Sequence, residues 1–204
     1  SSKICAVICE LDIEGELNLR GIGTSVSSGL DKGAIVDSDE LEKSIDRAIK
    51  RAEREAKVRP EKVLASIPIK GVQFVQNLGL LLSKEETGQI SLTDKLECIR
   101  RSNNIVKSSD QKMIHAVPME YKVDGDVVRN PIGVFGRTLE VQSHLILASS
   151  DTILVLTRIL KKLNCHISGL VYDSLASAQV MLLDEERKQG TVLVDIGGQF
   201  TKVS

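Results

Sequence analysis

The chain has 204 residues, 42% of them hydrophobic, so it can bury a core and form one or two domains. Its 27 Lys and Arg residues nearly balance 28 Asp and Glu residues, and a net charge of -1 lacks the positive field that nonspecific nucleic-acid binding requires. Aromatic residues make up only 2% of the chain, which removes the stacking platforms of single-strand binders. No nucleic-acid partner is therefore expected.

The cysteine pattern argues against a disulfide scaffold, a redox motif and a zinc site. Cys5, Cys9, Cys98 and Cys165 form no CxxC pair and have no histidine at ligand spacing. We therefore expect reduced thiols and a cytoplasmic location. No stretch approaches the roughly 18 uncharged apolar residues of a membrane span, and no signal peptide is recognisable. Because the chain starts at Ser1, directly before an apolar strand, we expect it to be a piece of a longer protein.

The N-terminal part predicts two strands, a helix and a third strand at residues 63–69. Residues 2–10 and 17–26 lack helical spacing and are typical of strands. Asp37 and Glu40 have the spacing of a capping box before a helix that Pro60 ends. The apolar face of this helix consists of Leu41, Ile45, Ala48, Ile49, Ala52 and Ala56. Its other face mixes basic and acidic residues, which is typical of a solvated surface.

A different pattern fills the middle of the chain, from residue 68 to residue 148. A helix is predicted over 93–106, with Leu96, Ile99, Asn103 and Val106 on one face. The strands predicted in this segment are 72–76, 113–117, 119–123 and 139–147. One helix among several strands predicts a small α/β module.

Alternation of helices and strands resumes after the middle segment. Asp151 can cap a helix whose apolar face is Ile153, Leu156, Leu160 and Leu163. The remaining elements expected are a strand at 167–171, a helix over 174–189 and a buried-type strand at 191–196. The fold class is therefore predicted to be α/β, with one domain interrupted by an insertion.

One short motif has the pattern of a phosphate loop. Asp195 closes a predicted strand and is followed by Ile196, Gly197 and Gly198, so that backbone N–H groups are open to a phosphate. The same letters also form ordinary tight turns, so the motif alone leaves both interpretations open. His115, His144 and His166 lack partners at catalytic spacing, and no hydrolytic triad is legible.

Several motifs, read together in order and spacing, resemble the FtsA family of bacterial cell-division proteins over essentially the whole chain. These motifs are Arg20-Gly21-Ile22-Gly23, residues 28–33 (SGLDKG), residues 115–121 (HAVPMEY), Asn130-Pro131-Ile132-Gly133, residues 169–178 (GLVYDSLASA) and the Asp195 to Gly198 turn.

This resemblance implies an actin-like, ribonuclease-H-like fold that stops before its second half. The first actin-like domain would comprise 1–67 and 149–190, the inserted interaction module 68–148, and the start of a second domain 191–204. The parent protein would bind ATP with Mg²⁺, polymerise at the inner face of the cell membrane, tether FtsZ filaments at midcell and recruit later division proteins. It would be a scaffold without catalytic residues, attached to the membrane by a C-terminal helix that lies beyond this chain.

The resemblance also assigns the phosphate-binding residues. Ser1, Ser2 and Lys3 look like the end of a first phosphate loop, and Asp195, Gly197 and Gly198 look like the second loop. Two positions depart from the family pattern, because the usual third glycine is Gln199 and the later acidic position is Lys202. With half of the first loop missing, we expect the 204-residue chain to hold no nucleotide tightly.

Three alternatives remain. A PilM-type pilus-assembly scaffold has a similar architecture, although the turn from Gly29 to Gly33 favours FtsA. A sugar-kinase-like phosphotransferase would need a carboxylate in a catalytic setting, and none is convincing here. A bare protein-interaction module is the third alternative.

Overall fold

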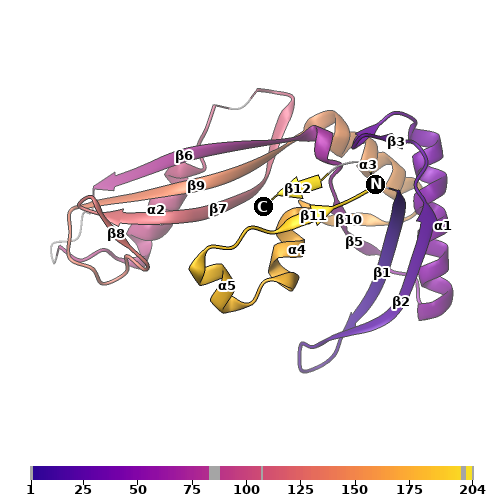
Figure 1. Ribbon diagram of the computed structural model, residues 1–204, viewed down its shortest axis with the longest axis horizontal. Coiled ribbons are helices and arrows are strands. Elements are labelled where there is room, and N and C mark those ends of the chain that lie inside the picture. Colours follow the sequence, from indigo (N-terminus) through magenta and orange to yellow (C-terminus); the bar gives the residue numbers. More distant parts are fainter. Residues whose placement is uncertain (1, 83–87, 107, 199–200, 204) are drawn as a thin grey trace. The chain divides into compact units, whose positions relative to one another are not determined.

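The computed structural model describes residues 2–82, 88–106, 108–198 and 201–203 of an α/β protein (Figure 1). The chain divides into two compact units. Unit 1 comprises Ser1–Gly71 with Asp151–Ser204, and unit 2 comprises Val72–Ser150. Unit 2 therefore covers most of the middle segment that the sequence pattern sets apart.

Unit 1 begins with an antiparallel hairpin covered on one face by a long helix. The hairpin strands are β1 (Lys3–Leu11) and β2 (Leu17–Val26), and the helix is α1 (Ser38–Ala56), as the sequence predicts. Ile8 of β1 packs with Ala52 and Ala56 of α1 in a small buried cluster. The positions of β2 that lie against α1 are buried and alternate along the strand, as a period of two requires.

Two glycines of β2 allow α1 to lie directly on the strand backbone. A Cβ atom on Gly21 would lie 2.5 Å from the Ala52 carbonyl oxygen, and one on Gly23 would lie 1.9 Å from the Ala48 carbonyl oxygen. Ser25 continues this seam, since its hydroxyl donates to the Ser44 carbonyl oxygen over 2.6 Å. The Arg20 to Gly23 motif is therefore a packing element.

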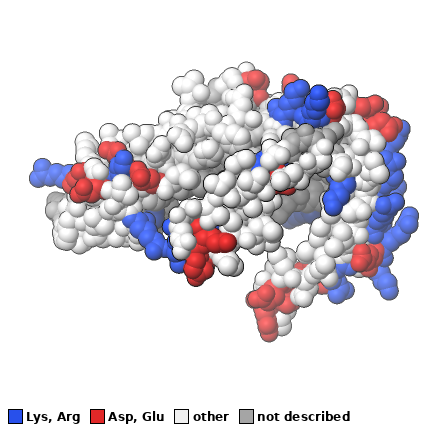
Figure 2. All heavy atoms as spheres, viewed as in Figure 1, with Lys and Arg blue, Asp and Glu red and all other residues white. Residues whose placement is uncertain are grey.

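The N-terminus of α1 forms half of the predicted capping box. Asp37 Oδ1 accepts hydrogen bonds from the backbone N–H groups of Asp39 and Glu40, at 2.9 and 3.0 Å. The Glu40 carboxylate accepts instead from Lys43 Nζ at 2.8 Å. The outer face of α1 carries mixed charges, which Figure 2 shows on the surface along this helix.

The rest of unit 1 places short strands and helices around these elements. β5 (Lys62–Ser66) pairs in parallel with β10 (His166–Val171). The part of the chain that joins these two strands contains unit 2 and then α3 (Ser150–Lys162). The helix buries Ile153, Leu156, Ile159 and Leu160, close to the predicted face. The further elements are β3 (Leu30–Asp31), β4 (Ala34–Ile35), the 3-10 turn η1 (Ile69–Gly71), α4 (Asp173–Met181), α5 (Asp184–Gln189), β11 (Val194–Ile196) and β12 (Thr201–Val203).

Two sequence predictions near the C-terminus are wrong in detail. The single helix predicted over 174–189 is two helices, because Leu182 and Leu183 have extended ψ angles of 132° and 157°. Leu183 donates its backbone N–H to Glu186 Oε2 at 2.8 Å, which starts a new helix. The strand predicted over 191–196 is shorter, and its residues are exposed in this structure.

Unit 2 is a four-stranded antiparallel sheet with one helix on it. The strands are β6 (Val72–Leu82), β7 (Gln111–Val123), β8 (Asp126–Val128) and β9 (Thr138–Ser149), in the order β6-β9-β7-β8. The predicted strands 113–117 and 119–123 form the single strand β7, whose register shifts between Pro118 and Glu120. An irregularity of the pairing next to Pro118 thus lies where the two predicted strands were separated.

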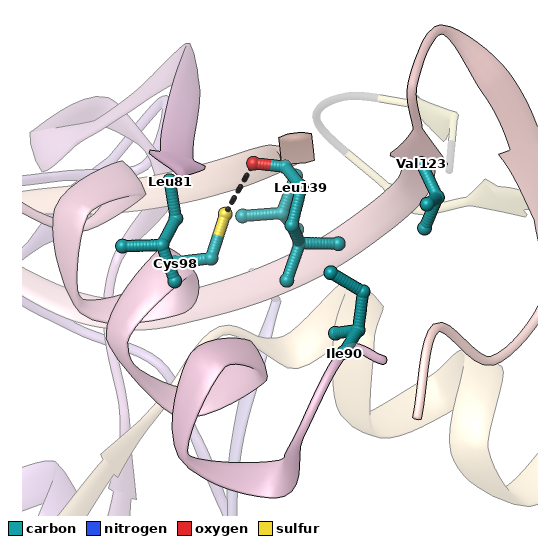
Figure 3. Close-up of a cluster of buried hydrophobic side chains, with 6 residues drawn as sticks. Leu81, Ile90, Cys98, Val123 and Leu139 are labelled. Carbon is teal, nitrogen blue, oxygen red and sulfur yellow. Dashed lines mark hydrogen bonds between the residues drawn. The ribbon is translucent and has the colours of Figure 1, made fainter. Parts of the chain in front are cut away.

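The core of unit 2 lies between its sheet and α2 (Leu92–Ser102) (Figure 3). Six buried side chains form this cluster: Leu81, Ile90, Cys98, Val123, Leu139 and Val141. Cys98 Sγ lies 3.3 Å from the Leu139 carbonyl oxygen, and burial raises the pKa of this thiol to about 11. Cys98 is therefore an uncharged core residue.

The face of α2 was predicted correctly only in part: Ile99 packs against the buried cluster as expected, but other positions differ. The structure buries Asp94, Cys98 and Ser102, whereas Leu96 is 58% exposed and Val106 lies beyond the helix. The reason is close packing, since a Cβ atom on Gly79 of β6 would lie 2.3 Å from the Cys98 carbonyl oxygen. Only small side chains fit on a helix face so near the strand.

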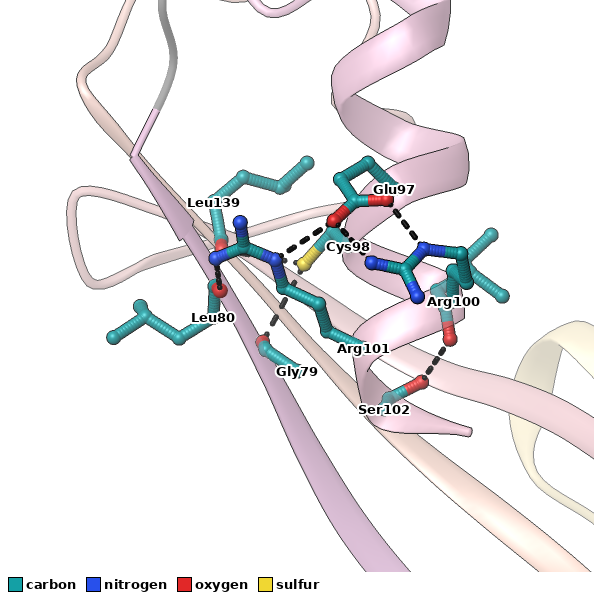
Figure 4. Close-up of polar contacts among 9 residues, drawn as sticks. Gly79, Leu80, Glu97, Cys98, Arg100, Arg101, Ser102 and Leu139 are labelled. Atoms are coloured by element: carbon teal, nitrogen blue, oxygen red, sulfur yellow. Dashed lines mark hydrogen bonds and ion pairs between the residues drawn. The ribbon is translucent and has the colours of Figure 1, made fainter. Parts of the chain in front are cut away.

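Polar contacts fix the C-terminal end of α2 on β6 (Figure 4). Arg101 Nη1 donates to the Leu80 carbonyl oxygen over 2.9 Å, and Asn77 Nδ2 donates to the Ser102 carbonyl oxygen over 2.8 Å. Glu97 accepts from both Arg100 and Arg101, and these hydrogen bonds lower its pKa to about 2. The helix is thereby held in a single register on the strand.

Candidate phosphate-binding site

The Asp195 motif lies on a short hairpin of unit 1. β11 and β12 are antiparallel, and Asp195 is the register partner of Lys202. Gly197 and Gly198 follow β11 and are exposed. The predicted departure at Gln199 lies outside the described residues. The motif therefore ends a strand, as expected, and its glycines are open to a ligand.

The first predicted loop residues lie beside this hairpin. A Cβ atom on Gly198 would have the Ser2 Cβ as its nearest neighbour, at 4.0 Å. The Ser2 carbonyl oxygen accepts from the Ser27 backbone N–H over 3.1 Å, which anchors the residue to the end of β2. Ser1 lies outside the described residues. Tertiary structure thus brings together residues 2 and 198, which are at opposite ends of the sequence.

One cavity of 910 Å³ in unit 1 unites these residues. Its wall includes Ser2, Lys3, Asp195, Gly197 and Gly198, together with parts of β1, β5 and α1. Five of the six predicted phosphate-site residues therefore line the same space, whereas the sixth is Ser1. A cavity of this size is in the range of small-molecule sites.

A charged cluster that the sequence prediction missed lies on the same wall. Lys202 Nζ forms an ion pair with Asp173 Oδ2 and a second one with Asp195 Oδ2 at 3.5 Å. The Lys202 side chain is only 12% exposed. Asp173 is the first residue of α4 and lies within the 169–178 motif. An acidic residue at the start of a helix is the sequence signal that could have drawn attention to it.

The electrostatic environment keeps Lys202 charged. Burial by itself lowers the pKa of its ammonium, but the hydrogen bond to Asp173 and the charges of Asp173 and Asp195 outweigh burial and leave the pKa above its ordinary value. Asp173 Oδ1 and the Ser174 hydroxyl are buried and have no hydrogen-bond partner among the residues that the structure describes. The cluster thus combines a fixed positive charge with unsatisfied polar atoms.

The histidines and cysteines form no second site. The His144 ring stacks on Phe74 with centroids 5.5 Å apart, and burial lowers the pKa of His115. Cys5 and Cys9 are exposed, whereas Cys98 and Cys165 are buried. Within the described part of the chain, no group of three or more His, Cys, Asp or Glu residues could hold a metal ion.

The helices give no sign of a membrane span. Among the residues that the structure describes, no helix combines the length and the apolar character needed to cross a bilayer.

A protein-family model matches the chain inside unit 2. Residues 72–147 match the family model described as the SHS2 domain inserted in FTSA. The matched segment begins with β6, includes β7 and β8, and ends within β9, two residues before the end of that strand.

The whole chain is similar to cell-division proteins of bacteria. It is 30% identical over 204 residues to the cell division protein FtsA of Borreliella burgdorferi, covering 100% of this chain and 49% of that protein. It is 26% identical over 199 residues to FtsA of Escherichia coli K12, covering 97% of this chain and 47% of that protein. The chain therefore spans about half the length of the curated relatives it matches, and the predicted resemblance to FtsA is confirmed.

A solved structure supports the fold. The PilM-PilN type IV pilus biogenesis complex contains a chain that superposes with a TM-score of 0.65 at 14% identity, covering 99% of this chain and 54% of that one. At this identity the likeness concerns the fold alone. Together with the SHS2 match, it confirms the predicted α/β class with an inserted module.

Proposed function

We propose that this chain, which is similar over its whole length to about half of FtsA, is part of an actin-like scaffold for bacterial cell division. The observation that carries the proposal is the combination of 30% identity across all 204 residues with an FtsA-type SHS2 domain at 72–147. The scaffold would act at the inner face of the cell membrane. It would tether FtsZ filaments and associate with further copies of itself.

The cavity of unit 1 is the proposed nucleotide site. The backbone N–H groups of Gly197 and Gly198 would bind phosphate oxygens of ATP, and Ser2 and Lys3 would face them from the end of β1. The open space at Gly198 supports this assignment, because no described heavy atom beyond its neighbours lies nearer than 4.0 Å to a Cβ placed there. ATP bound in this cavity would place its phosphate groups between the two loops.

We expect a methyl group at residue 198 to weaken ATP binding at least about tenfold, because it would occupy the phosphate approach without disturbing the fold. The nearest atom to the added Cβ would be at ordinary contact distance, 4.0 Å, so Gly198→Ala should keep the thermal stability of the wild type. Calorimetric titration of the complete gene product with ATP measures the effect. The control is Leu96→Ala on α2 of unit 2, whose exposed side chain is not part of the cavity wall. Equal ATP affinity of Gly198→Ala and wild type would contradict this assignment.

Unit 2 is proposed to bind later division proteins. β6 lies at one edge of the sheet, and four of its apolar side chains are exposed: Phe74, Leu78, Leu80 and Leu82. They alternate along the strand and so lie on one face. An edge strand with an exposed apolar row favours pairing or docking of another chain. This surface supports an interaction role for the inserted domain.

The division role is tested in cells that carry the gene for this sequence. A fluorescent fusion expressed from its native locus is expected to form a band at midcell that disappears when FtsZ is depleted. Depletion of the protein itself should give long undivided cells. A diffuse or polar signal combined with normal division would contradict the proposal.

The structural likeness to the PilM-PilN complex supports one alternative, a scaffold for pilus assembly. The same depletion strain separates the two functions. Loss of surface pili with unchanged cell length would favour the pilus scaffold, whereas undivided cells with normal piliation would favour division.

A further inference from the structure

Lys202 lies where a carboxylate is expected in the phosphate site of FtsA-like chains, and it changes the charge of that site. We propose that the Lys202 ammonium is the resident cation of this site, so that Asp173 and Asp195 do not take up a divalent metal ion. The Mg²⁺ that the family resemblance implies therefore does not fit these residues. This inference concerns the chain itself and holds whether or not the protein acts in division.

The geometry of the cluster carries the proposal. Lys202 contacts both carboxylates, Asp173 from the start of α4 and Asp195 from β11. Its side chain is nearly nine-tenths buried, and the hairpin register holds Lys202 opposite Asp195. Two elements and a strand pairing therefore fix the ammonium between the two acids. A divalent ion bound by the same oxygens would have to displace or approach a buried positive charge.

The charge balance of the cavity supports the same conclusion. Its charged wall residues are Lys3, Lys62 and Lys202 against Asp173 and Asp195, which leaves an excess of one positive charge. Such a wall attracts a phosphate group without the help of a metal ion. Without the Lys202 charge, Lys3 and Lys62 would only balance Asp173 and Asp195, and the wall would carry no net positive charge to attract an anion.

The test measures binding of Mn²⁺ alone, by the electron paramagnetic resonance signal of the free ion. For the wild-type chain we expect no saturable binding below about 1 mM. Lys202→Met keeps an apolar stem but removes the charge, and we expect it to bind one Mn²⁺ at least about tenfold more tightly than the wild type. The matched control Lys202→Arg keeps the positive charge and should resemble the wild type.

The double variant Lys202→Met with Asp195→Asn should lose the gained affinity, which would locate the new site at Asp195. Tight Mn²⁺ binding by the wild type that Asp195→Asn removes would overturn the proposal. So would a folded Lys202→Met chain that gains no Mn²⁺ affinity. If Lys202→Met does not fold, the wild-type and Asp195→Asn measurements decide alone. Because the ligand is a metal ion and not a nucleotide or FtsZ, failure here is distinct from failure of the division role.

Discussion

Gly23→Ala is expected to destabilise unit 1 by about 3 kcal/mol or more, which is a large fraction of the stability of an ordinary domain. The added Cβ would lie 1.9 Å from the Ala48 carbonyl oxygen and 2.5 Å from the Ala52 backbone nitrogen. Neither backbone atom can rotate away, so α1 would have to move off β2 as a whole. Amide hydrogen exchange should quicken about 100-fold in β1, β2 and α1.

The matched control for this change is Gly169→Ala in β10. Its Cβ would meet only the Leu64 Cδ2 atom, at 2.9 Å, and a terminal methyl of a flexible side chain can move. We expect a loss below about 1 kcal/mol. Equal stability of Gly23→Ala and Gly169→Ala would show that α1 does not lie on β2 as closely as the structure places it.

Leu139→Ala is expected to destabilise unit 2 by about 3 kcal/mol or more, because it removes a fully buried side chain from the cluster under α2 and leaves a cavity. Leu139 is 0% exposed, and its neighbours in the cluster include Leu81, Ile90 and Val141. Urea unfolding measures the loss of unfolding free energy, and amide hydrogen exchange in β6, β7 and β9 shows that the loss falls on unit 2. Exchange in α1 should change little if the units unfold separately.

The control for Leu139→Ala is Leu96→Ala on α2. Leu96 is 58% exposed, so we expect less than about 1 kcal/mol of destabilisation. This pair also tests which face of α2 is buried, since the sequence pattern placed Leu96 inward. A larger loss for Leu96→Ala than for Leu139→Ala would reverse the observed orientation of the helix.

Local signals in the sequence determined most of the elements correctly. The strands β1 and β2 follow from their period, and the start of α1 follows from the cap at Asp37. These features depend on neighbours within a few residues. The resemblance of the ordered motifs to FtsA was equally readable, because order and spacing are properties of the sequence alone.

Contacts between distant residues decided what the sequence left open. The buried face of α2 depended on Gly79, a glycine of another element, which lets the backbone of the helix approach β6 closely at Cys98 and Ser102. The helical period of apolar residues predicted that Leu96 would be buried, because such a pattern reflects the position of apolar residues and not the space available to their side chains. Likewise, the irregularity next to Pro118 belongs to the pairing of β7 with β9.

The candidate site divides in the same way. The sequence by itself identified Asp195, Gly197 and Gly198 by their strand-to-glycine pattern, and it marked Lys202 as a departure from the family. Only the tertiary structure placed Ser2 beside Gly198 and enclosed Lys202 between Asp173 and Asp195. The physical reason is that a charge acquires its partners from folding, which brings a helix start at residue 173 against a hairpin at residues 195 and 202.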